Sequence, residues 1–380
     1  MPFSFQIEAC PAPGRARTGY FHTPHGSVPT PAFMPVGTRA SVKGVLPRDV
    51  AEAGATMILA NTLHLALRPG PEIVRELGGL HKVMNWKGPI LTDSGGYQVF
   101  SMADVSKIRE DGVTFRSVVD GKPMHLTPES AMEIQCDLGA DVIMAFDQCP
   151  ADPLDRRGVE EATERTHRWL DRCVRRWREL GGTDRGQALF GIVQGGCFED
   201  LRRQSIDAIC SHDLVGYAIG GISVGEGREA IRDAFAMATP LLPADKPRYL
   251  MGIGTPVDFF DAVAEGADLF DCVTPTRHGR NHQAFTSRGK VNLRNLRWAR
   301  DTGPLDPECP CVACTEYPVG AIRHLCTVGE MLGGTLVSMH NLTFFHRLMA
   351  RIREAVAAGT LAELRAEVLP QVERRLPGDE

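Results

Sequence analysis

The chain has 380 residues, of which 43% are apolar, with 42 lysines and arginines against 47 aspartates and glutamates. This apolar share excludes a disordered chain, and no apolar run reaches the roughly 18–20 residues that span a membrane. The formal charge of −5 excludes a generally basic nucleic-acid coat but not a local basic patch. The 11 scattered cysteines and the lack of a signal-peptide pattern predict a reducing, cytoplasmic location.

Eight short apolar runs end in polar or glycine-rich residues, which is typical of strands buried on both faces of a parallel sheet. Helical patterns lie between several of them, at 47–55, 69–79, 127–140 and 158–180. This alternation predicts an α/β fold, a (β/α)8 TIM barrel, with an open doubly wound sheet as the alternative. The predicted strands lie at 28–36, 56–60, 88–92, 141–146, 188–193, 216–220, 248–253 and 267–272.

Two departures from the strand–helix alternation define further parts of the chain. Residues 112–126 alternate in polarity around Asp120-Gly121, which predicts a small β-hairpin insertion. After residue 300 a proline- and cysteine-rich stretch is followed by helical patterns, one of which covers 336–359 and stops at Gly359. We therefore expect a barrel with the catalytic site at 1–300, and a zinc-binding subdomain with carboxy-terminal helices packed on the barrel at 301–380.

Polar residues follow the predicted strands, and the carboxyl ends of barrel strands are where active sites of this fold lie. Three carboxylates that converge there favour acid–base or nucleophilic chemistry, although a single aspartate after a strand is more often a helix cap. The amide and glycine residues could meet the edge of a flat heterocycle, and Tyr97 and Met251 its faces, or simply pack. The strand-end residues are Asn61, Asp93, Asp147, Gln194, Gly220, Gly221, Gly252 and Asp271.

A basic strip follows Asp271. Residues 272–300 include seven lysines and arginines and no acidic residue. This one-sided charge favours contact with a phosphate backbone over a merely solvated face. The seven are Arg277, Arg280, Arg288, Lys290, Arg294, Arg297 and Arg300.

A cysteine–histidine cluster predicts a metal site. Cys309, Cys311 and Cys314 are closely spaced, and His340 on a following helix completes a Cys3His set typical of tetrahedral zinc. Four protein ligands leave no open position, so this zinc would be structural. His324, His346 and Cys326 are competing ligands, and buried thiols without metal are the alternative.

Together these residues resemble the bacterial type of queuine tRNA-ribosyltransferases, the tRNA-guanine transglycosylases. The matching strings occur in order over most of the chain, beside the cysteine cluster. They are LTDSGGYQVFS (91–101), FDQCP (146–150), GIVQGG (191–196), GGISVGE (220–226), YLMGIG (249–254) and DLFDCVTPTR (268–277).

The resemblance implies a zinc-bearing pentosyltransferase, a homodimer, that exchanges the wobble guanine of certain tRNAs for 7-aminomethyl-7-deazaguanine in queuosine biosynthesis. Exchange without loss of configuration calls for two displacements through a covalent ribosyl-enzyme, as in retaining glycosidases. Asp271 matches the nucleophile and Asp93 the general acid/base. The implied zinc ligands are Cys309, Cys311, Cys314 and His340; the implied base-binding residues are Asp147, Gln194, Gly221, Ile222, Tyr97, Met251, Cys149 and Val224; the implied RNA contacts are Thr276, Arg277 and Arg280.

Three positions depart from the family pattern. His282 stands where a glycine is usual, Gln148 where bacterial members often have glutamate, and residues 318–321 replace a Ser-Arg-Ala-Tyr string in a region that helps form the dimer. Two other functions compete with the transglycosylase. A non-catalytic tRNA-binding paralogue, serving as a partner subunit, would be expected to lack the nucleophile. A barrel metallohydrolase needs metal ligands at strand ends, where His64 is a loose candidate.

Overall fold

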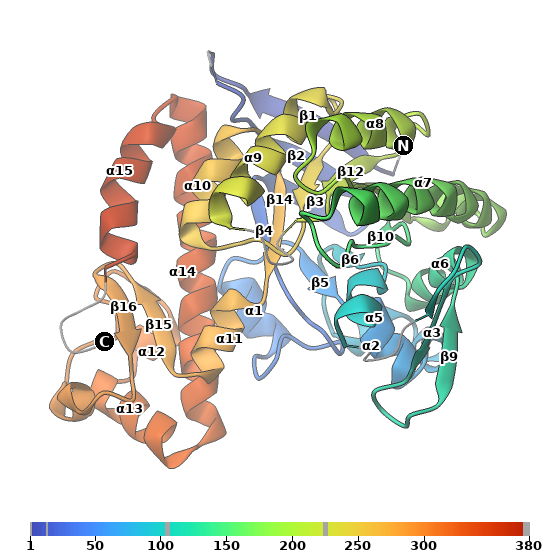
Figure 1. Cartoon of the computed structure of the whole chain (residues 1–380). Helices are drawn as coiled ribbons and strands as arrows, with labels where there is room; N and C mark the ends of the chain where they lie inside the picture. The colour runs from blue at the N-terminus through green and yellow to red at the C-terminus, as the bar shows by residue number, and fades with distance from the viewer. Residues whose placement is uncertain (1, 13, 103–106, 223–226, 375–380) are drawn as a thin grey trace.

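The computed structural model describes residues 2–12, 14–102, 107–222 and 227–374, without the side chains of residues 100–102. Its centre is a parallel sheet with the strand order β4-β14-β13-β12-β11-β10-β6-β5 (Figure 1). A parallel bridge between Val36 and Leu59 joins the two ends of that order, so the sheet forms a nearly closed barrel. The predicted (β/α)8 barrel is confirmed, and the open doubly wound sheet is wrong.

Each of the eight predicted runs contains one barrel strand, and nearly all the strand residues are buried, as expected for strands covered on both faces. The run at 28–36 is divided between β3 (Gly26–Thr30) and the first barrel strand. The barrel strands are β4 (Ala32–Pro35), β5 (Ile58–Ala60), β6 (Ile90–Thr92), β10 (Val142–Met144), β11 (Ala188–Val193), β12 (Gly216–Ile219), β13 (Arg248–Leu250) and β14 (Leu269–Cys272).

An amino-terminal antiparallel sheet of β1 (Ser4–Ala9), β2 (Thr18–Thr23) and β3 closes the barrel at the amino-terminal ends of its strands. Its side chains Phe21 and Val28 belong to the same buried cluster as residues of the barrel interior. The Phe21 ring lies 5.8 Å from the ring of Phe190 on β11. This sheet was not predicted from the sequence.

Helices surround the barrel (Figure 1). The local sequence explains both ends of α6. Thr127 and Ser130 form a capping box at its start, and Gly139 ends the helix in the left-handed region. No helix in the described part of the chain is both long and apolar enough to cross a membrane. The surrounding helices are α1 (Pro47–Glu52), α2 (Thr62–Leu67), α3 (Pro71–Glu76), α4 (Leu80–Val83), α5 (Gly96–Met102), α6 (Pro128–Leu138), α7 (Arg156–Glu179), α8 (Glu199–Cys210), α9 (Arg228–Ala238) and α10 (Pro256–Ala264).

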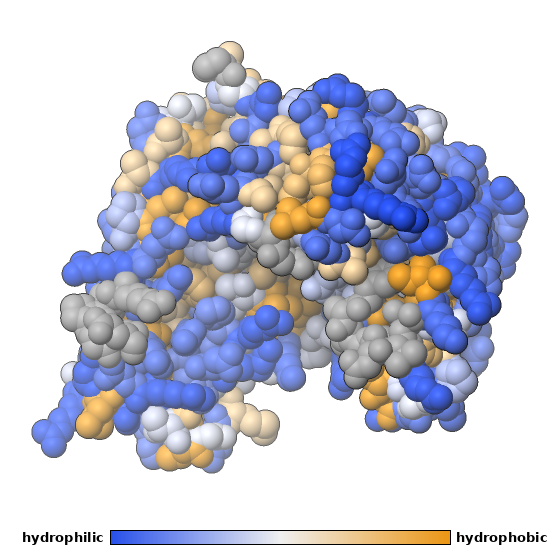
Figure 2. Space-filling model, in the orientation of Figure 1, coloured by the Kyte–Doolittle hydropathy of each residue, from blue (hydrophilic) through white to orange (hydrophobic). Residues whose placement is uncertain are grey.

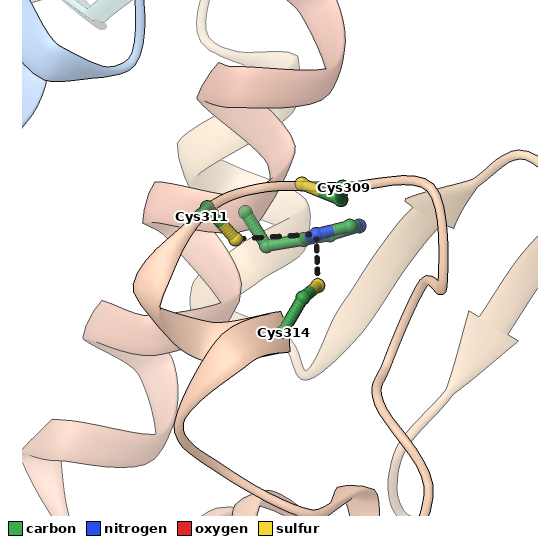
Figure 3. A group of neighbouring side chains, drawn as sticks. Cys309, Cys311 and Cys314 are labelled. Atoms are coloured by element: carbon green, nitrogen blue, oxygen red, sulfur yellow. Dashed lines mark hydrogen bonds between the residues drawn. The ribbon is translucent and has the colours of Figure 1, made fainter.

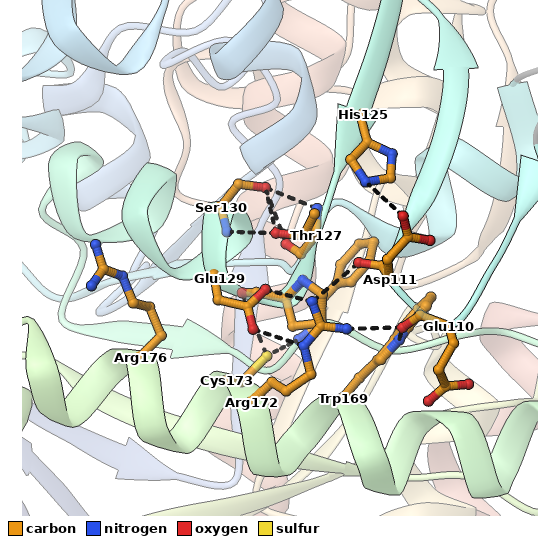
Figure 4. Close-up of polar contacts among 12 residues, drawn as sticks. Glu110, Asp111, His125, Thr127, Glu129, Ser130, Trp169, Arg172, Cys173 and Arg176 are labelled. Atoms are coloured by element: carbon orange, nitrogen blue, oxygen red, sulfur yellow. Dashed lines mark hydrogen bonds and ion pairs between the residues drawn. The ribbon is translucent and has the colours of Figure 1, made fainter.

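The predicted insertion is a hairpin of β8 (Val113–Arg116) and β9 (Pro123–Leu126), extended by the short strand β7 (Lys107–Ile108). Long side chains of α7 hold it in place (Figure 4). Trp169 Nε1 donates to the Glu110 carbonyl at 2.9 Å, and Arg172 Nη1 donates to the same oxygen at 2.8 Å. Arg172 also forms an ion pair with Glu129 at the start of α6.

After β14 the chain leaves the barrel through α11 (Thr274–Arg280) and returns along α14 (Met331–Ala358). The first turns of α14 share a buried core with the excursion, and its later turns pack in the barrel core beside α1 and α10. Helix α14 ends at Gly359, as predicted. Because it packs against α1, α10 and β4, it occupies the place of the eighth barrel helix. The other elements after β14 are β15 (Gln283–Thr286), β16 (Gly289–Asn292), η3 (Leu296–Arg300), α12 (Val312–Thr315), α13 (Val319–Val328) and α15 (Leu361–Val372). Two short 3-10 helices, η1 (Gly182–Arg185) and η2 (Thr239–Leu241), follow α7 and α9.

Two ion pairs near the amino-terminus differ in burial and predict different stability effects. Arg17 and Asp268 are 3% and 0% exposed and lie 2.5 Å apart, whereas Arg15, paired with Glu265, is 51% exposed. Arg17→Leu leaves Asp268 buried without its ion-pair partner and is expected to lower the free energy of unfolding by about 3–5 kcal/mol. Arg15→Leu should change it by less than about 1 kcal/mol. Urea denaturation of both variants measures the difference, and equal midpoints would show that the buried pair contributes no more to stability than the exposed pair.

Candidate active site

A cavity of about 480 Å³ lies at the carboxyl ends of the barrel strands. Asp93 follows β6, Asp147 follows β10, and Asp271 belongs to β14, so three segments distant in sequence bring carboxylates to one cavity. The structure thus brings the predicted strand-end carboxylates together. Other lining residues include Asn61, His64, Ser94, Tyr97, Gln98, Cys149, Gly220, Gly221, Ile222, Tyr249, Met251, Gly252, Cys272 and Arg277.

The Asp271 carboxylate is held through one of its two oxygens. Tyr249 Oη and the Gly252 amide both donate to Oδ1, each at 2.6 Å. Among the described residues, no hydrogen bond reaches Oδ2. Burial raises the pKa of Asp271 above its usual value; the two hydrogen bonds oppose this rise, and the nearby charge of Asp93 adds to it. The arrangement leaves one oxygen available to attack an electrophile in the cavity.

Three donors hold the Asp93 carboxylate. The Thr62 amide donates to Oδ1 at 2.8 Å, and Gln98 Nε2 donates to Oδ2 at 2.6 Å. The Asn61 side chain donates to Oδ2 as well. Burial nevertheless raises the pKa of Asp93 above its usual value, with these hydrogen bonds opposing the rise. A carboxyl group with a raised pKa can carry a proton nearer to neutral pH than an exposed one can.

Asp147 is fixed from both sides. Ser94 Oγ donates to Oδ1 at 2.9 Å, and Gln194 Nε2 donates to Oδ2 at 2.7 Å. Burial raises the pKa of Asp147 to about 6. Gln194 is fully buried and stands behind Asp147, outside the cavity lining. Its direct partner in this structure is therefore the carboxylate that faces the cavity.

Two glycines allow the polar groups to come this close. A Cβ on Gly96 would lie 2.7 Å from the Asp147 carbonyl oxygen, and a Cβ on Gly221 would lie 2.2 Å from Gln194 Oε1. Gly221 also has a φ of +64°, which other residues rarely adopt. The glycine pairs of the DSGGY and GGIS strings therefore meet a steric need at this cavity.

The predicted stacking and pocket residues lie around the same space. Tyr97 is 54% exposed at the rim, while Ile222 is buried and Met251 is half-buried. Cys149 also lines the cavity. Val224 lies outside the described residues.

The predicted RNA contacts on α11 differ in exposure. Arg277 is exposed and lines the cavity, and Arg280 is half-buried. Thr276 is only 4% exposed, and its hydroxyl donates to the Val273 carbonyl at 3.4 Å. The structure therefore places the two arginines, but not the threonine side chain, where a large ligand could meet them.

Two of the unusual residues have a local explanation. His282 has a φ of +65°, a backbone conformation that glycine adopts without strain, and its Nδ1 accepts a hydrogen bond from Arg294 Nε at 3.2 Å. Gln148 accepts a hydrogen bond from Arg165 on α7 and is absent from the cavity lining. The glutamine in place of the usual glutamate therefore alters the charge beside α7 and not the charge of the cavity lining.

The cysteine cluster forms one compact group of donors (Figure 3). The ligand atoms of Cys309, Cys311, Cys314 and His340 lie within 4.8 Å of one another. His340 Nδ1 lies 3.2 Å from Cys314 Sγ and 3.7 Å from Cys311 Sγ, and its Nε2 lies 2.7 Å from the Phe285 carbonyl. This carbonyl fixes the ring with Nδ1 towards the sulfurs, as in structural metal sites. A metal ion fits this set of three sulfurs and one nitrogen, in which His324, His346 and Cys326 do not take part.

Tyr249 was not singled out from the sequence. Strand residues two apart point to the same side. The position of Tyr249 two residues before Met251 could therefore have indicated that it lines the same cavity. The metallohydrolase alternative finds no support here. Among the described residues, neither potential metal-ligating group lies at the cavity, and His64 belongs to neither of them.

Comparison with known proteins agrees with this geometry. The model of the queuine tRNA-ribosyltransferase family matches residues 11–374. The chain is 50% identical over 361 residues to the queuine tRNA-ribosyltransferase of Lysinibacillus sphaericus, and the matched region covers 95% of this chain and 93% of that protein. It is 52% identical over 361 residues to the protein of the same name from Synechococcus sp., with 95% and 96% coverage. The corresponding protein of Geobacillus kaustophilus is 50% identical over 367 residues, with 96% and 95% coverage.

Proposed function

Since the chain belongs to the queuine tRNA-ribosyltransferase family and is thus a tRNA-guanine transglycosylase, we propose that it works by double displacement through a ribosyl ester of Asp271. The incoming base is 7-aminomethyl-7-deazaguanine, and the product belongs to queuosine biosynthesis. The observation that carries the proposal is the cavity in which Asp93, Asp147 and Asp271 converge with Asp271 Oδ2 available.

In the first displacement, Asp271 Oδ2 attacks C1′ of the wobble guanosine. A C1′–O bond forms, the C1′–N9 bond breaks, and its electron pair leaves with the guanine. Tyr249 and Gly252 hold the carboxylate in one orientation during the attack. The incoming base then attacks C1′ through N9, which breaks the ester bond and restores the carboxylate. Two inversions retain the configuration at the sugar.

Asp93 supplies and removes the protons. The leaving guanine takes a proton, and the incoming base loses one from N9, so one group with a raised pKa can serve in both directions. Three hydrogen bonds hold the carboxylate in place where it lines the cavity.

Asp147 is the proposed acceptor for the donor edge of the base. Ring nitrogen N1 and the exocyclic amino group of guanine both carry protons, and an ionised carboxylate accepts both. Gly221 and Ile222 line the same cavity, Tyr97 and Met251 are the proposed contacts for the faces of the ring, and Gln194 is the proposed positioning residue for Asp147. Cys149, with Val224, is the proposed lining for the small aminomethyl substituent.

This assignment predicts a pH-dependent affinity for 7-aminomethyl-7-deazaguanine. Because the pKa of Asp147 is about 6, its carboxylate is ionised above that pH and protonated below it. The dissociation constant should fall as pH rises towards 7, and rise about tenfold per unit below pH 6. Calorimetric titrations between pH 5 and 8 measure this, with Asp147→Asn as the comparison. An unchanged profile in that variant would assign the titration to another group.

The basic strip is the proposed contact for the phosphates of the anticodon stem-loop. Figure 2 shows the surface hollowed between the lobe with β15, β16 and α13 and the lobe with β8 and β9. Arg277 reaches the cavity from the first of these sides. Turning the target base out of its stack costs a few kcal/mol, which phosphate contacts can offset.

The affinity for tRNA should therefore fall steeply with salt. Arg294 is exposed, its Nε donates to His282, and none of the ion pairs formed by the described residues includes it. Arg294→Gln is expected to reduce the slope of log affinity against log salt by about 1. Arg157→Gln, on the outer face of α7 beside Glu161, is the matched control and should leave the slope unchanged. Equal slopes in both variants would remove Arg294 from the RNA contact.

We further propose zinc as the ion of the Cys3His site and a homodimer as the assembly. Zinc there would be held by Cys309, Cys311, Cys314 and His340 and would stabilise the segment around α12 and α14 without an open position for chemistry. Val328, Met331 and Leu332 are exposed at the corner between α13 and α14, with Met331 88% exposed, and this apolar corner supports a protein contact. We propose that the enzyme acts on its tRNA in the cytoplasm.

A base-exchange assay tests the proposed function. The protein is incubated with radiolabelled guanine and unmodified tRNA bearing a wobble guanine, then with 7-aminomethyl-7-deazaguanine. Label should enter the tRNA and then be displaced. Failure of folded, zinc-loaded protein to incorporate label would favour the non-catalytic tRNA-binding paralogue instead.

A further inference from the structure

A second group of metal-ligating side chains lies at the amino-terminal ends of the barrel strands, opposite the cavity. It consists of His25 in the turn between β2 and β3, His81 on α4, and Asp141 directly before β10. Their ligand atoms lie within 4.8 Å of one another. The base exchange described above uses none of them.

We propose that His25, His81 and Asp141 bind a divalent transition-metal ion that fastens the amino-terminal sheet to the barrel. Two imidazole nitrogens and one carboxylate oxygen suit Zn²⁺ and its neighbours in the first transition row. His25 Nδ1 lies 2.7 Å from Asp141 Oδ1, and His81 Nε2 lies 3.0 Å from Oδ2. Both nitrogens therefore face one carboxylate. The two rings are stacked, with centroids 3.6 Å apart and 17° between their planes.

The surroundings support the carboxylate as a ligand. Asp141 is 1% exposed, and the Ile90 amide donates to its Oδ2 at 2.8 Å. Hydrogen bonds of this kind orient the carboxylates of metal sites. Since Ile90 begins β6, Asp141 already joins two barrel strands to the two histidine segments.

The space at the site suits an ion after a small movement. Tetrahedral coordination with bonds of about 2.0–2.2 Å separates the ligand atoms by about 3.3 Å, so the histidine nitrogens must move outward by a few tenths of an ångström, and the two nearly parallel rings must tilt so that both point to one ion. The His25 side chain is 44% exposed on a hairpin turn, and the His81 side chain is 14% exposed. His25 therefore has room to move, and water can reach the fourth position.

The ion would act on stability and not on base exchange. Its three ligands belong to the β2–β3 turn, α4 and the start of β10, which are far apart in sequence. An ion that binds only the folded arrangement stabilises it by mass action. Its position at the end of the barrel away from the cavity separates it from the reaction.

Calorimetric titration of the holoenzyme, with its Cys3His site already loaded, tests the proposal with Zn²⁺ alone. The wild type should bind one further Zn²⁺ per chain, and its melting temperature should rise with added Zn²⁺. His25→Gln and His81→Gln should each weaken this binding at least about tenfold, with base exchange unchanged. His22→Gln is the matched control, because His22 lies on the same sheet and contacts Ser27 instead. Absence of a further ion in the wild type, or binding that persists in both variants, would overturn the site.

Discussion

Replacing Asp271 with asparagine is expected to lower base exchange by roughly 10⁴- to 10⁶-fold, the order seen when the nucleophile of a covalent mechanism is removed. The amide has nearly the same shape and can still accept hydrogen bonds from Tyr249 and Gly252, so the cavity should keep its geometry. It cannot form the ribosyl ester. Steady-state exchange of labelled guanine into tRNA measures the loss.

Two controls separate loss of the nucleophile from loss of the fold. Zinc content, melting temperature and tRNA affinity of Asp271→Asn should stay close to those of the wild type. On a denaturing gel, labelled tRNA should remain attached to the wild-type protein and not to the variant. A covalent adduct or near-normal turnover in the variant would show that another group attacks C1′.

Asp271 also sets an expected limit on activity at low pH. Its nucleophilic form is the carboxylate, and burial raises the pKa of this group. The value of kcat/KM should therefore fall as pH decreases through that raised pKa, at a higher pH than for an exposed aspartate.

Replacing Cys311 with serine is expected to lower metal content and thermal stability together. A four-ligand site loses affinity when one thiolate is lost, and the free energy of metal binding is also folding free energy, about 10–16 kcal/mol for small zinc domains. The excursion between β14 and α14 has only a small core of its own, so it depends on the ion. Metal analysis and thermal unfolding of the same samples measure both effects.

Cys326→Ser is the matched control for this variant. Cys326 is 3% exposed in the same small core, but it is not one of the four clustered ligands. Its substitution should cost about 1–3 kcal/mol, as for an added buried polar group, with metal content unchanged. Full occupancy by zinc in Cys311→Ser would refute the site, and loss of the metal in Cys326→Ser would point to a different ligand set.

The sequence by itself determined the features that depend on contiguous residues. Strands such as 188–193 are marked by unbroken apolar runs, α6 by its capping box, the hairpin by Asp120-Gly121, and α14 by its terminal Gly359. These signals are local because backbone conformation and burial pattern repeat over a few residues. The order of strands and their polar ends then predicted the barrel and the carboxylates at its mouth.

Only the tertiary structure decided which side chains meet. Thr276 is buried by the packing of its helix, and Gln194 turns out to stand behind Asp147. Tyr249 reaches Asp271 across neighbouring strands, and His25 reaches Asp141 across 116 positions of the chain. Such contacts depend on barrel closure, on strand register and on how tightly helices pack. No local pattern encodes these distances, because each is set jointly by segments that are far apart in the sequence.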